Sequence, residues 1–298
     1  MGIKKLIDKY ATRCWAIGFV RGGMDAIMQA DQIECDWLRM PLDRWFADPF
    51  ILDVTDREIR LLVEDYGYDS KKGVISLLHI DRKSMDIISR KVLLDMPTHL
   101  SFPAIWRKDG RVYVYPESAK SGKLNMYEYH PETETLSFVQ TICDDVVWDS
   151  YITEAFGELQ MFTAAQNDNH LDIYKWNEKK KRFVPNFDIV STKRDSRMGG
   201  AVFEYEGARY YPAQNCEIVY GGSINIKKIN YSNGKFELSI IKSLTSPHPH
   251  YQLGLHTLNE YKGVVVIDAH GYRYKIVGPI LAWLIGLKKK RSSPISQQ

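Results

Sequence analysis

The sequence is poor in cysteine and nearly balanced in charge. Its four cysteines are scattered over 298 residues without a CxxC pair, which excludes the usual zinc and dithiol redox motifs. Isolated cysteines are typical of a reducing compartment. The 40 basic residues outnumber the 37 acidic ones by only three, so no general electrostatic field for nucleic acid is expected. We therefore predict no nucleic-acid partner and no cysteine-based site.

Long apolar segments are also scarce. Residues 1–10 are interrupted by charge and lack the apolar core of a secretion signal. The uncharged run 276–287 would rise only about 18 Å as a helix, which is well short of a bilayer core. These absences predict a cytoplasmic protein that does not cross a membrane through this run.

One pattern is repeated five times along the chain. Each copy has a short polar signature, an apolar strand, a turn and a second apolar strand, as in residues 45–65. The signature positions are Asp48, Phe102, Asp149, Gly199 and His256, at spacings of 54, 47, 50 and 57 residues. A period near 50 residues, with room for four strands in each copy, is typical of propeller blades.

The segments between the copies supply the outer strands of each blade. Residues 171–176 and 223–229 largely alternate apolar with polar side chains, which indicates strands rather than helices. We therefore predict an all-β fold, a five-bladed β-propeller over residues 45–275, preceded by an N-terminal extension, 1–44. Within that extension, residues 13–20 form a strand that joins the last blade or covers the propeller edge. A sandwich of unrelated hairpins is the alternative.

The last segment, 276–298, combines the uncharged run with a cluster of cations. Residues 288–291 read Lys-Lys-Lys-Arg, and each cation gains about 1 kcal/mol near anionic lipid. As a helix lying in the interface, the segment would place Trp283 at headgroup depth. We therefore predict a tail that attaches the protein peripherally to a membrane surface. A terminal helix that caps the propeller is the alternative.

The repeat would bring three carboxylates from successive blades to one end of the propeller channel. Asp48 precedes Pro49, which predicts an extended, rigid backbone and makes this carboxylate a candidate base or sugar-hydroxyl acceptor. Glu117 and Asp149 belong to the second and third copies. Paired carboxyl groups serve sugar chemistry because one protonates the departing oxygen while the other activates the attacking group. We predict catalytic roles for these three acids; turn caps and strand ends are the alternative.

Arg197 stands in the stretch best suited to phosphate. Its guanidinium can contact a phosphate or carboxylate through two hydrogen bonds, and Gly199 and Gly200 permit close backbone approach. The alternative is an ion pair between Arg197 and Asp195 or another channel acid.

Further polar side chains are suited to sugar hydroxyls or to adjusting the acidity of the carboxylates. Together with Arg197, the predicted substrate-binding residues are Glu64, His99, Gln214, Asn215, Tyr220, His256 and Asp268. His270 adds a second histidine near Asp268, but such a group without a set geometry does not define a metal site. We assign no metal ligand and no cofactor, and leave the use of a divalent metal open.

Several short motifs together resemble a known domain. They are Trp45–Phe50, His99–Pro103, Tyr115–Ser118, Ser196–Gly200 and Tyr211–Cys216, followed by Tyr220-Gly221. Their order and spacing over residues 45–270 are similar to the propeller-like domain at the N-terminus of plant glucosamine inositolphosphorylceramide transferases and in bacterial glycan-locus proteins. In the plant proteins the recognised transferase domain is a separate, C-terminal one. The resemblance therefore implies a role with glycans without implying catalysis by the propeller alone.

A more distant likeness concerns the first blade. Ala47-Asp48-Pro49 resembles the corresponding motif of arabinanase and levansucrase-type five-bladed glycosidases, which place three acids around the channel. The resemblance implies that Asp48 takes the position of the base and leaves Asp149 and Glu117 as candidates for the other two acids.

Three functions follow from these observations. The favoured one is a protein of glycan or glycolipid biosynthesis that transfers a sugar or related group from a lipid-linked or nucleotide-activated substrate. Its expected partners are a saccharide or nucleotide-sugar, a lipid-linked glycan and the membrane surface. A non-catalytic carbohydrate-binding module, or a scaffold for a partner transferase, is the first alternative. A glycoside hydrolase is the second, so whether the chain is an enzyme at all stays open.

Overall fold

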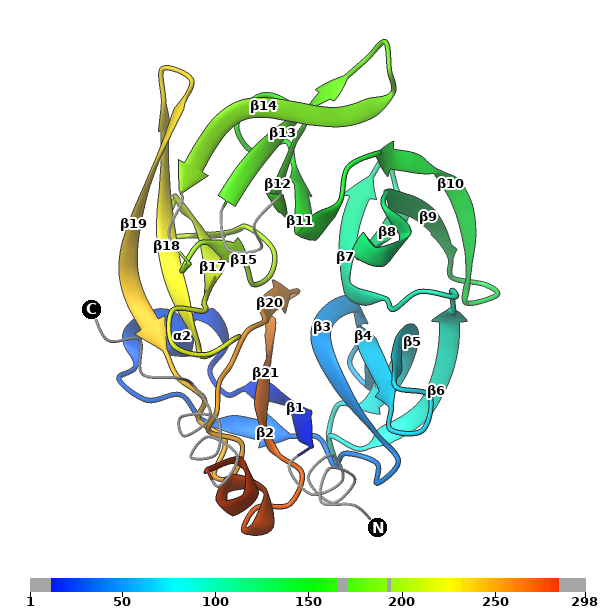
Figure 1. Cartoon of the computed structure of the whole chain (residues 1–298), viewed down its shortest axis with the longest axis vertical. Helices are drawn as coiled ribbons and strands as arrows, with labels where there is room; N and C mark the ends of the chain where they lie inside the picture. Colours follow the sequence, from blue (N-terminus) through cyan, green and yellow to red (C-terminus); the bar gives the residue numbers. More distant parts are fainter. Residues whose placement is uncertain (1–11, 166–170, 192–193, 284–298) are drawn as a thin grey trace, which may run out of the picture.

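The computed structural model describes residues 12–165, 171–191 and 194–283. Five sheets are arranged around a common axis as a five-bladed β-propeller, which confirms the predicted fold (Figure 1). In each sheet the neighbouring strands run antiparallel. The basic residues 288–291 of the predicted tail lie outside the described residues.

Blades one to three each contain four strands in chain order. Blade one consists of β3 (Arg44–Val54), β4 (Glu58–Gly67), β5 (Lys72–Asp81) and β6 (Ile87–Leu94). Blade two consists of β7 (Ser101–Lys108), β8 (Arg111–Glu117), β9 (Leu124–His130) and β10 (Thr135–Cys143), with the 3₁₀ turn η1 (Ala119–Ser121) between β8 and β9. Blade three consists of β11 (Val147–Thr153), β12 (Gln160–Ala165), β13 (Leu171–Asn177) and β14 (Arg182–Ser191).

Blade four has a divided inner strand. Both β15 (Arg197–Met198) and β16 (Phe203–Tyr205) pair with β17 (Ala208–Asn215), which is followed by β18 (Ser223–Ser232) and β19 (Lys235–Leu244). The break includes Gly200, whose φ of +146° favours glycine. A Cβ atom there would lie 2.0 Å from the backbone oxygen of Leu258 in the next blade. The glycine therefore allows two blades to approach closely near the axis.

Blade five joins the two ends of the described chain. β20 (Leu258–Tyr261) and β21 (Val264–Tyr272) pair with β1 (Arg13–Val20) and β2 (Cys35–Trp37), in the order β2-β1-β21-β20. The short helix α2 (Gly23–Gln29) connects β1 to β2. β1 therefore takes the first of its two predicted placements, within the last blade. The fifth sheet thus draws strands from both sides of the predicted boundary at residue 45.

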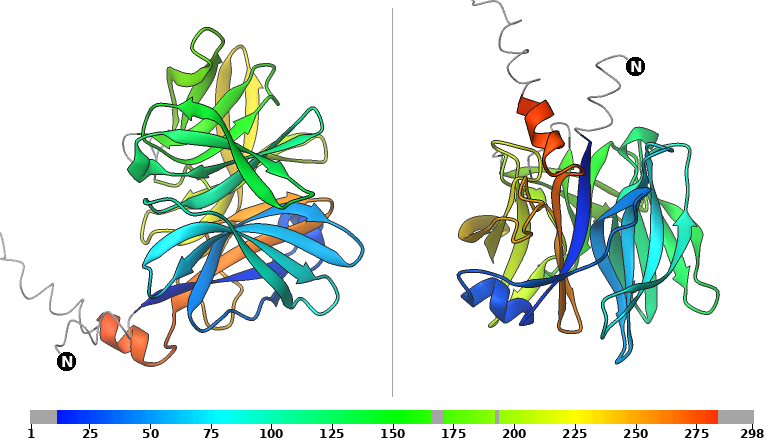
Figure 2. Two further views of the ribbon diagram at one scale, coloured as in Figure 1. Left: turned by 90° about the vertical axis from the view of Figure 1, so that its right-hand side faces the viewer. Right: turned by 90° about the horizontal axis from the view of Figure 1, so that it is seen from below.

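Residues 277–283 form a helix at one end of the propeller, beside the start of β1 (Figure 2). A hydrogen bond from the backbone N–H of Arg273 to the carbonyl of Thr12, at 3.0 Å, links the two segments. Ile276, Ile280 and Trp283 are exposed. Within the described part of the chain, no helix combines the length and apolar character that crossing a membrane requires.

The inner strands of the first three blades share a left-handed residue at the predicted signature position. Asp48, Phe102 and Asp149 have φ angles of +49°, +42° and +44°. The strand register shifts at each of these sites, which marks a β-bulge. The extended backbone predicted for Asp48 is therefore wrong: Pro49 disfavours only the right-handed helical region, and the bulge uses the left-handed one. Each such residue costs about 1–3 kcal/mol, which the surrounding sheet must offset.

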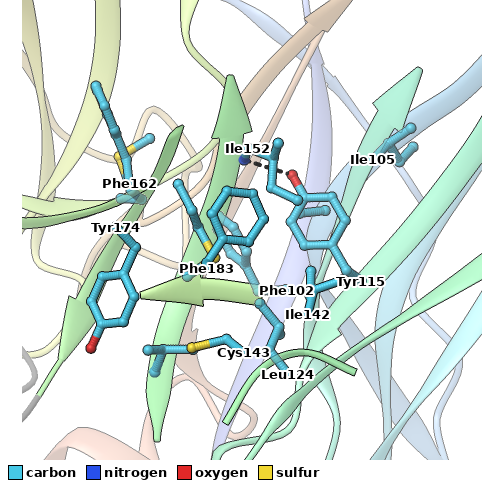
Figure 3. Close-up of a cluster of buried hydrophobic side chains, with 14 of the residues drawn as sticks. Phe102, Ile105, Tyr115, Leu124, Ile142, Cys143, Ile152, Phe162, Tyr174 and Phe183 are labelled. Atoms are coloured by element: carbon cyan, nitrogen blue, oxygen red, sulfur yellow. Dashed lines mark hydrogen bonds between the residues drawn. The ribbon is translucent and has the colours of Figure 1, made fainter. Parts of the chain in front are cut away.

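Apolar side chains fill the space between neighbouring blades. Figure 3 shows such a cluster, in which Tyr115 from blade two lies beside Ile152 from blade three, and to which Phe102 and Phe162 from the same two blades also belong. All four side chains are buried. The Tyr115 hydroxyl accepts a hydrogen bond from the backbone N–H of Ile152 at 2.9 Å, so a polar contact also joins the two blades.

We expect Tyr115→Phe to lower the free energy of unfolding by about 1–3 kcal/mol, because it leaves the buried N–H of Ile152 without its acceptor. Urea denaturation monitored by tryptophan fluorescence measures the change. Tyr113→Phe is the matched control. Because Tyr113 is only half-buried, loss of its hydroxyl should lower the free energy of unfolding by less than about 0.5 kcal/mol. Equal effects of the two substitutions would contradict the prediction.

Candidate functional site

The inner strands bring remote residues together in one pocket, here termed the axial pocket. It has a volume of about 400 Å³ and is lined from all five blades. Eight of the eleven predicted site residues line it: Asp48, Glu64, His99, Glu117, Asp149, Arg197, Tyr220 and His256. The other three, Gln214, Asn215 and Asp268, are not part of its lining.

Asp48 is buried where blades one, two and five meet. One carboxylate oxygen accepts a hydrogen bond from the backbone N–H of Phe102 at 3.0 Å, and the other accepts one from the Thr257 hydroxyl at 2.9 Å. Burial raises the pKa of Asp48; the charge of His256 opposes this, and neighbouring carboxylates add to it. A fixed carboxylate with a raised pKa is a stronger base than a free aspartate.

Glu64 and His99 form a pair on the wall of the pocket. The backbone N–H of Gly73 donates to His99 Nδ1 at 2.9 Å, so the ring proton is on Nε2. Nε2 lies 3.1 Å from Glu64 Oε1 and donates to it. Burial lowers the pKa of His99, which favours this neutral ring. Burial and the charge of Asp48 raise the pKa of Glu64 well above its ordinary value.

Arg197 holds two of the three predicted catalytic acids. Its Nε donates to Asp149 Oδ2, and its Nη2 lies 3.5 Å from Glu117 Oε2. The Gln214 amide donates to the same Asp149 oxygen at 2.6 Å. The sequence left open whether Arg197 binds phosphate or pairs with a channel acid. In the structure it pairs with channel acids, and its partners are Asp149 and Glu117 rather than Asp195.

The two acids held by Arg197 have opposite pKa shifts. Burial raises the pKa of Glu117 well above its ordinary value, and the adjacent Asp149 carboxylate raises it further. Burial alone would raise the pKa of Asp149 as well, but the charge and hydrogen bond of Arg197 outweigh it and lower the pKa. The backbone N–H of Asp149 also donates to Glu117 Oε2 at 3.2 Å. The environment therefore favours a protonated Glu117 beside an ionised Asp149, the arrangement of an acid–base pair.

His256 is a second buried cation of the pocket, which the exposed Arg13 also lines. Its Nδ1 lies 2.8 Å from Asp268 Oδ2, and its Nε2 lies 3.6 Å from Asp48 Oδ1. Burial would lower the pKa of His256, but the two carboxylates raise it to about 9. The Trp15 ring stacks on the imidazole with a centroid separation of 3.8 Å. His256 is therefore charged at neutral pH and neutralises part of the acidic cluster.

The ligand atoms of Asp48, His256 and Asp268 lie within 4.8 Å of one another, a spacing that a metal ion could use. Asp268, however, accepts hydrogen bonds from the backbone N–H groups of Asp48, His256 and Thr257, and from the His256 ring. These bonds occupy its lone pairs, and the charged His256 has no nitrogen lone pair to offer. In this arrangement the three residues form a hydrogen-bonded ion cluster and do not fit a metal.

The three predicted residues outside the lining differ in whether they hydrogen-bond to residues that line the pocket. Gln214 is buried behind Asp149 and also donates to the backbone oxygen of Met198 at 2.7 Å. Asp268 fixes His256, as described above. Asn215 lies where β17 ends, and its side-chain oxygen accepts a hydrogen bond from the backbone N–H of Glu217 at 3.1 Å. Asn215 thus stabilises a turn, because the chain reverses directly after it.

Aromatic residues that the sequence analysis did not select also line the pocket. Trp45 and Tyr66 stack with ring centroids 4.6 Å apart, and Trp15 lies on another side. Trp45 belongs to the first signature, so the repeat could have indicated that it lies near the axis. Trp15 reaches the pocket because β1 completes the fifth blade, one of the two placements predicted for residues 13–20, but that prediction did not say which side chains of the strand face the axis. The pocket therefore combines flat apolar walls with a small number of polar groups, as small-molecule sites do.

We expect Arg197→Ala to lower the free energy of unfolding by about 3–5 kcal/mol, because it leaves two buried carboxyl groups without their cation. Chemical denaturation at pH 7 measures the change. Arg21→Ala is the control, since Arg21 pairs with Asp36 at the surface with 60% of its side chain exposed, and its loss should leave the stability almost unchanged. A small effect at both positions would show that Arg197 does not neutralise the acids.

A second prediction concerns pH. The pKa of His256 is about 9 in the folded protein against an ordinary 6.5, so the folded state binds this proton more tightly than the unfolded state. The stabilisation is fully present below pH 6.5 and is lost as the pH rises through about 9, an effect of about 3 kcal/mol. We expect urea unfolding to show this loss across that window, and to show less of it in His256→Gln. Identical pH dependence in both proteins would contradict the assignment.

Comparison with known proteins identifies the family. Residues 39–244 match the family described as glucosamine inositolphosphorylceramide transferase 1, N-terminal. The Arabidopsis thaliana protein named glucosamine inositolphosphorylceramide transferase 1 is 27% identical over 200 residues, which cover 62% of this chain and 25% of the plant protein. The Oryza sativa subsp. japonica protein of the same name is 24% identical over 196 residues, which cover 61% and 26%. The chain thus spans about a quarter of the length of these curated relatives.

Solved structures share the fold at low sequence identity. A GH43 β-xylosidase/α-arabinofuranosidase from a compost microbial metagenome superposes with a TM-score of 0.54 at 12% identity, over 78% of this chain and 92% of the other. An exo-β-1,3-galactanase from Phanerochaete chrysosporium superposes with a TM-score of 0.54 at 9% identity, over 76% and 60%. These likenesses establish the architecture alone. By the sequence match over most of its length, the chain belongs to the family of glucosamine inositolphosphorylceramide transferase 1 N-terminal domains.

Proposed function

We propose that this protein binds the saccharide part of a glycan or glycolipid precursor in the axial pocket and transfers a sugar or related group there. The observation that carries the proposal is the contact of Glu117 with Asp149, two acids whose pKa values shift in opposite directions, in one pocket with the base candidate Asp48. The plant relatives are named as transferases for glucosamine and inositolphosphorylceramide, which supports the same class of substrate.

The pocket suits a saccharide in size and chemistry. Its volume of about 400 Å³ lies within the range of small-molecule sites. Trp45, Tyr66 and Trp15 offer flat apolar surfaces, while Ser101 and His99 add hydrogen-bonding groups at the wall. A sugar ring has both kinds of surface, since its hydroxyls surround apolar C–H faces.

The acids have complementary tasks in the proposed reaction. The Glu117 carboxyl donates its proton to the oxygen that leaves the anomeric carbon as that bond breaks. An acceptor hydroxyl attacks the same carbon, and Asp48 takes the proton that this hydroxyl loses as the new bond forms. Arg197 and Asp149 act through Glu117, because their charges set its protonation.

The position of the pocket favours a lipid-linked substrate. Thr12, which lines the pocket, is hydrogen-bonded to Arg273, and a helix with exposed apolar residues begins four residues later, at 277 (Figure 2). Trp283 is 64% exposed on this helix. The basic residues 288–291 follow in the sequence. A peripheral attachment of this end to an anionic membrane would present the pocket to lipid headgroups.

A non-catalytic saccharide-binding role is the second candidate. The observation that favours it is the ion pair of Arg197 with Asp149 and Glu117, which can equally serve to hold the pocket in shape. A binding domain would also suit a family whose matched region is a quarter of its larger relatives.

We expect Glu117→Gln to lower the rate of sugar transfer by about 10²–10⁴-fold, because the amide cannot supply the proton. The assay follows radiolabelled sugar from nucleotide-activated donors onto lipid-linked acceptors in vesicles. The affinity for the saccharide, measured by calorimetry, should change by less than tenfold. Glu158→Gln, which alters an exposed glutamate paired with Lys175, is the control and should leave both unchanged.

Other outcomes select other functions. Saturable saccharide binding without turnover by any donor would support the binding module and remove the transfer step. Release of sugar from aryl glycosides by water would indicate a hydrolase. Full transfer by Glu117→Gln, with unchanged thermal stability, would remove Glu117 from the mechanism.

A further inference from the structure

A second pocket lies at the opposite end of the same inner strands. It has a volume of about 520 Å³ and is lined by blades one, two and five. β3 runs from Asp48 in the axial pocket to Leu52 and Asp53 in this one. Tyr261, at the turn between β20 and β21, closes its blade-five side. None of the residues given a role in sugar transfer lines it, so its polar groups need a separate explanation.

Cations from two blades line this second pocket. Arg60 comes from β4, Arg107 and Lys108 from the end of β7, and Arg111 from the start of β8. Lys108 forms a salt bridge with Glu154, with 2.8 Å between Lys108 Nζ and Glu154 Oε1. The three arginines are therefore the cations available to a ligand in the pocket.

Arg107 is held in place without a carboxylate. Its Nη2 donates to the backbone oxygens of Ile51 and Leu52 at 2.9 and 3.0 Å, and its guanidinium stacks on the Tyr261 ring at 3.8 Å. Among the described residues, no aspartate or glutamate forms a salt bridge with it. These contacts orient the guanidinium without a carboxylate in salt-bridge contact, although the charge of Asp53 in the same pocket acts on it.

Two of the three acids that line the pocket, Asp53 and Glu128, are compensated, while the third, Asp109, is exposed at the turn between β7 and β8. Asp53 pairs with Lys262 at 2.7 Å, and Glu128 lies 3.7 Å from Arg111. Arg60 uses its Nε to bind Glu58 at 2.8 Å, outside the lining. Because Asp53, Glu58 and Glu128 each already have a cation and Asp109 is exposed to water, Arg107 leaves the pocket attractive to an anion.

Tyr129 gives an independent indication of a ligand. Its side chain is buried, with 6% of the residue exposed, and it lines the pocket. Its hydroxyl finds no hydrogen-bond partner within the described parts of the chain. A buried hydroxyl without a partner is unfavourable by about 1–3 kcal/mol, so such groups are usually paired with something. Burial, with the nearby charge of Glu134, raises the pKa of Tyr129, so the hydroxyl stays protonated and can donate.

We propose that this second pocket binds the phosphate group of a phosphorylated small molecule, with Arg107 and the Tyr129 hydroxyl as its principal donors and Arg60 and Arg111 at its sides. A phosphate group is preferred to a carboxylate because its three terminal oxygens can accept from donors on several sides at once. The donors here come from four different strands, β4, β7, β8 and β9, and therefore surround a ligand rather than forming one plane. Guanidinium groups also match phosphate oxygens in geometry.

The test uses isothermal titration calorimetry of the full chain at low salt, with pyrophosphate, glucose 1-phosphate and glucuronate as probes. The two phosphorylated probes should bind, and glucuronate should bind at least tenfold more weakly. Arg107→Gln and Tyr129→Phe should each weaken the binding of phosphorylated probes by about tenfold or more. Tyr129→Phe should not lower the melting temperature without ligand, because the hydroxyl it removes has no partner in the protein.

Arg209→Gln is the matched control, since Arg209 also lies over an aromatic ring, that of Phe156, at 5.4 Å from its centroid. It removes an arginine–aromatic contact outside this pocket and should leave binding unchanged. The proposal is overturned if neither phosphorylated probe binds at millimolar concentration. It is also overturned if Arg107→Gln and Tyr129→Phe bind like the wild type, or if glucuronate binds as tightly as glucose 1-phosphate.

Discussion

The pairing of β1 with β21 is the constraint on which the rest of the structure depends. Seven residues, Arg13 through Phe19, are in register with β21 across the fifth sheet. Each blade packs against its two neighbours, so a fifth blade without β1 would leave the ring of blades open beside the axial pocket. β1 also carries Trp15, whose ring lies against His256. The axial pocket is thus a product of ring closure as much as of the residues that line it.

Closure gathers charges that would repel one another if all were ionised. The buried carboxyl groups near the axis are Asp48, Glu64, Glu117, Asp149 and Asp268, and the cations are Arg197 and His256. Unpaired buried charges cost several kcal/mol each. The structure avoids this in two ways. Burial raises the pKa of Glu64 and Glu117 well above the ordinary value, which favours their neutral forms, and a cation lies beside each of Asp48, Asp149 and Asp268. Protonated and ionised carboxyls therefore coexist within one cavity.

The architecture could be predicted because a 50-residue period and strand alternation are local properties of the sequence. The meeting of Asp48, Asp149 and Arg197 followed from the same repeat, since equivalent positions of the blades face the axis. The ion-pair partners of these residues could not be predicted in the same way. The sequence allowed Arg197 to pair with Asp195 or with another channel acid, and the packing of the blades selects Asp149. The left-handed backbone of Asp48 depends on a bulge, and a bulge is set by the register of two strands.

Closing the ring with both ends of the chain also has a consequence for biosynthesis. β1 leaves the ribosome before its partner, because the paired residues of β21 follow about 250 residues later in the sequence. At 5–20 residues per second, β1 waits on the order of 10–50 s for its partner. Throughout that interval the apolar strand Cys14–Val20 has an unpaired edge, which can pair with other nascent chains. Shielding of this strand during translation is therefore expected to control how much of the protein reaches its folded form.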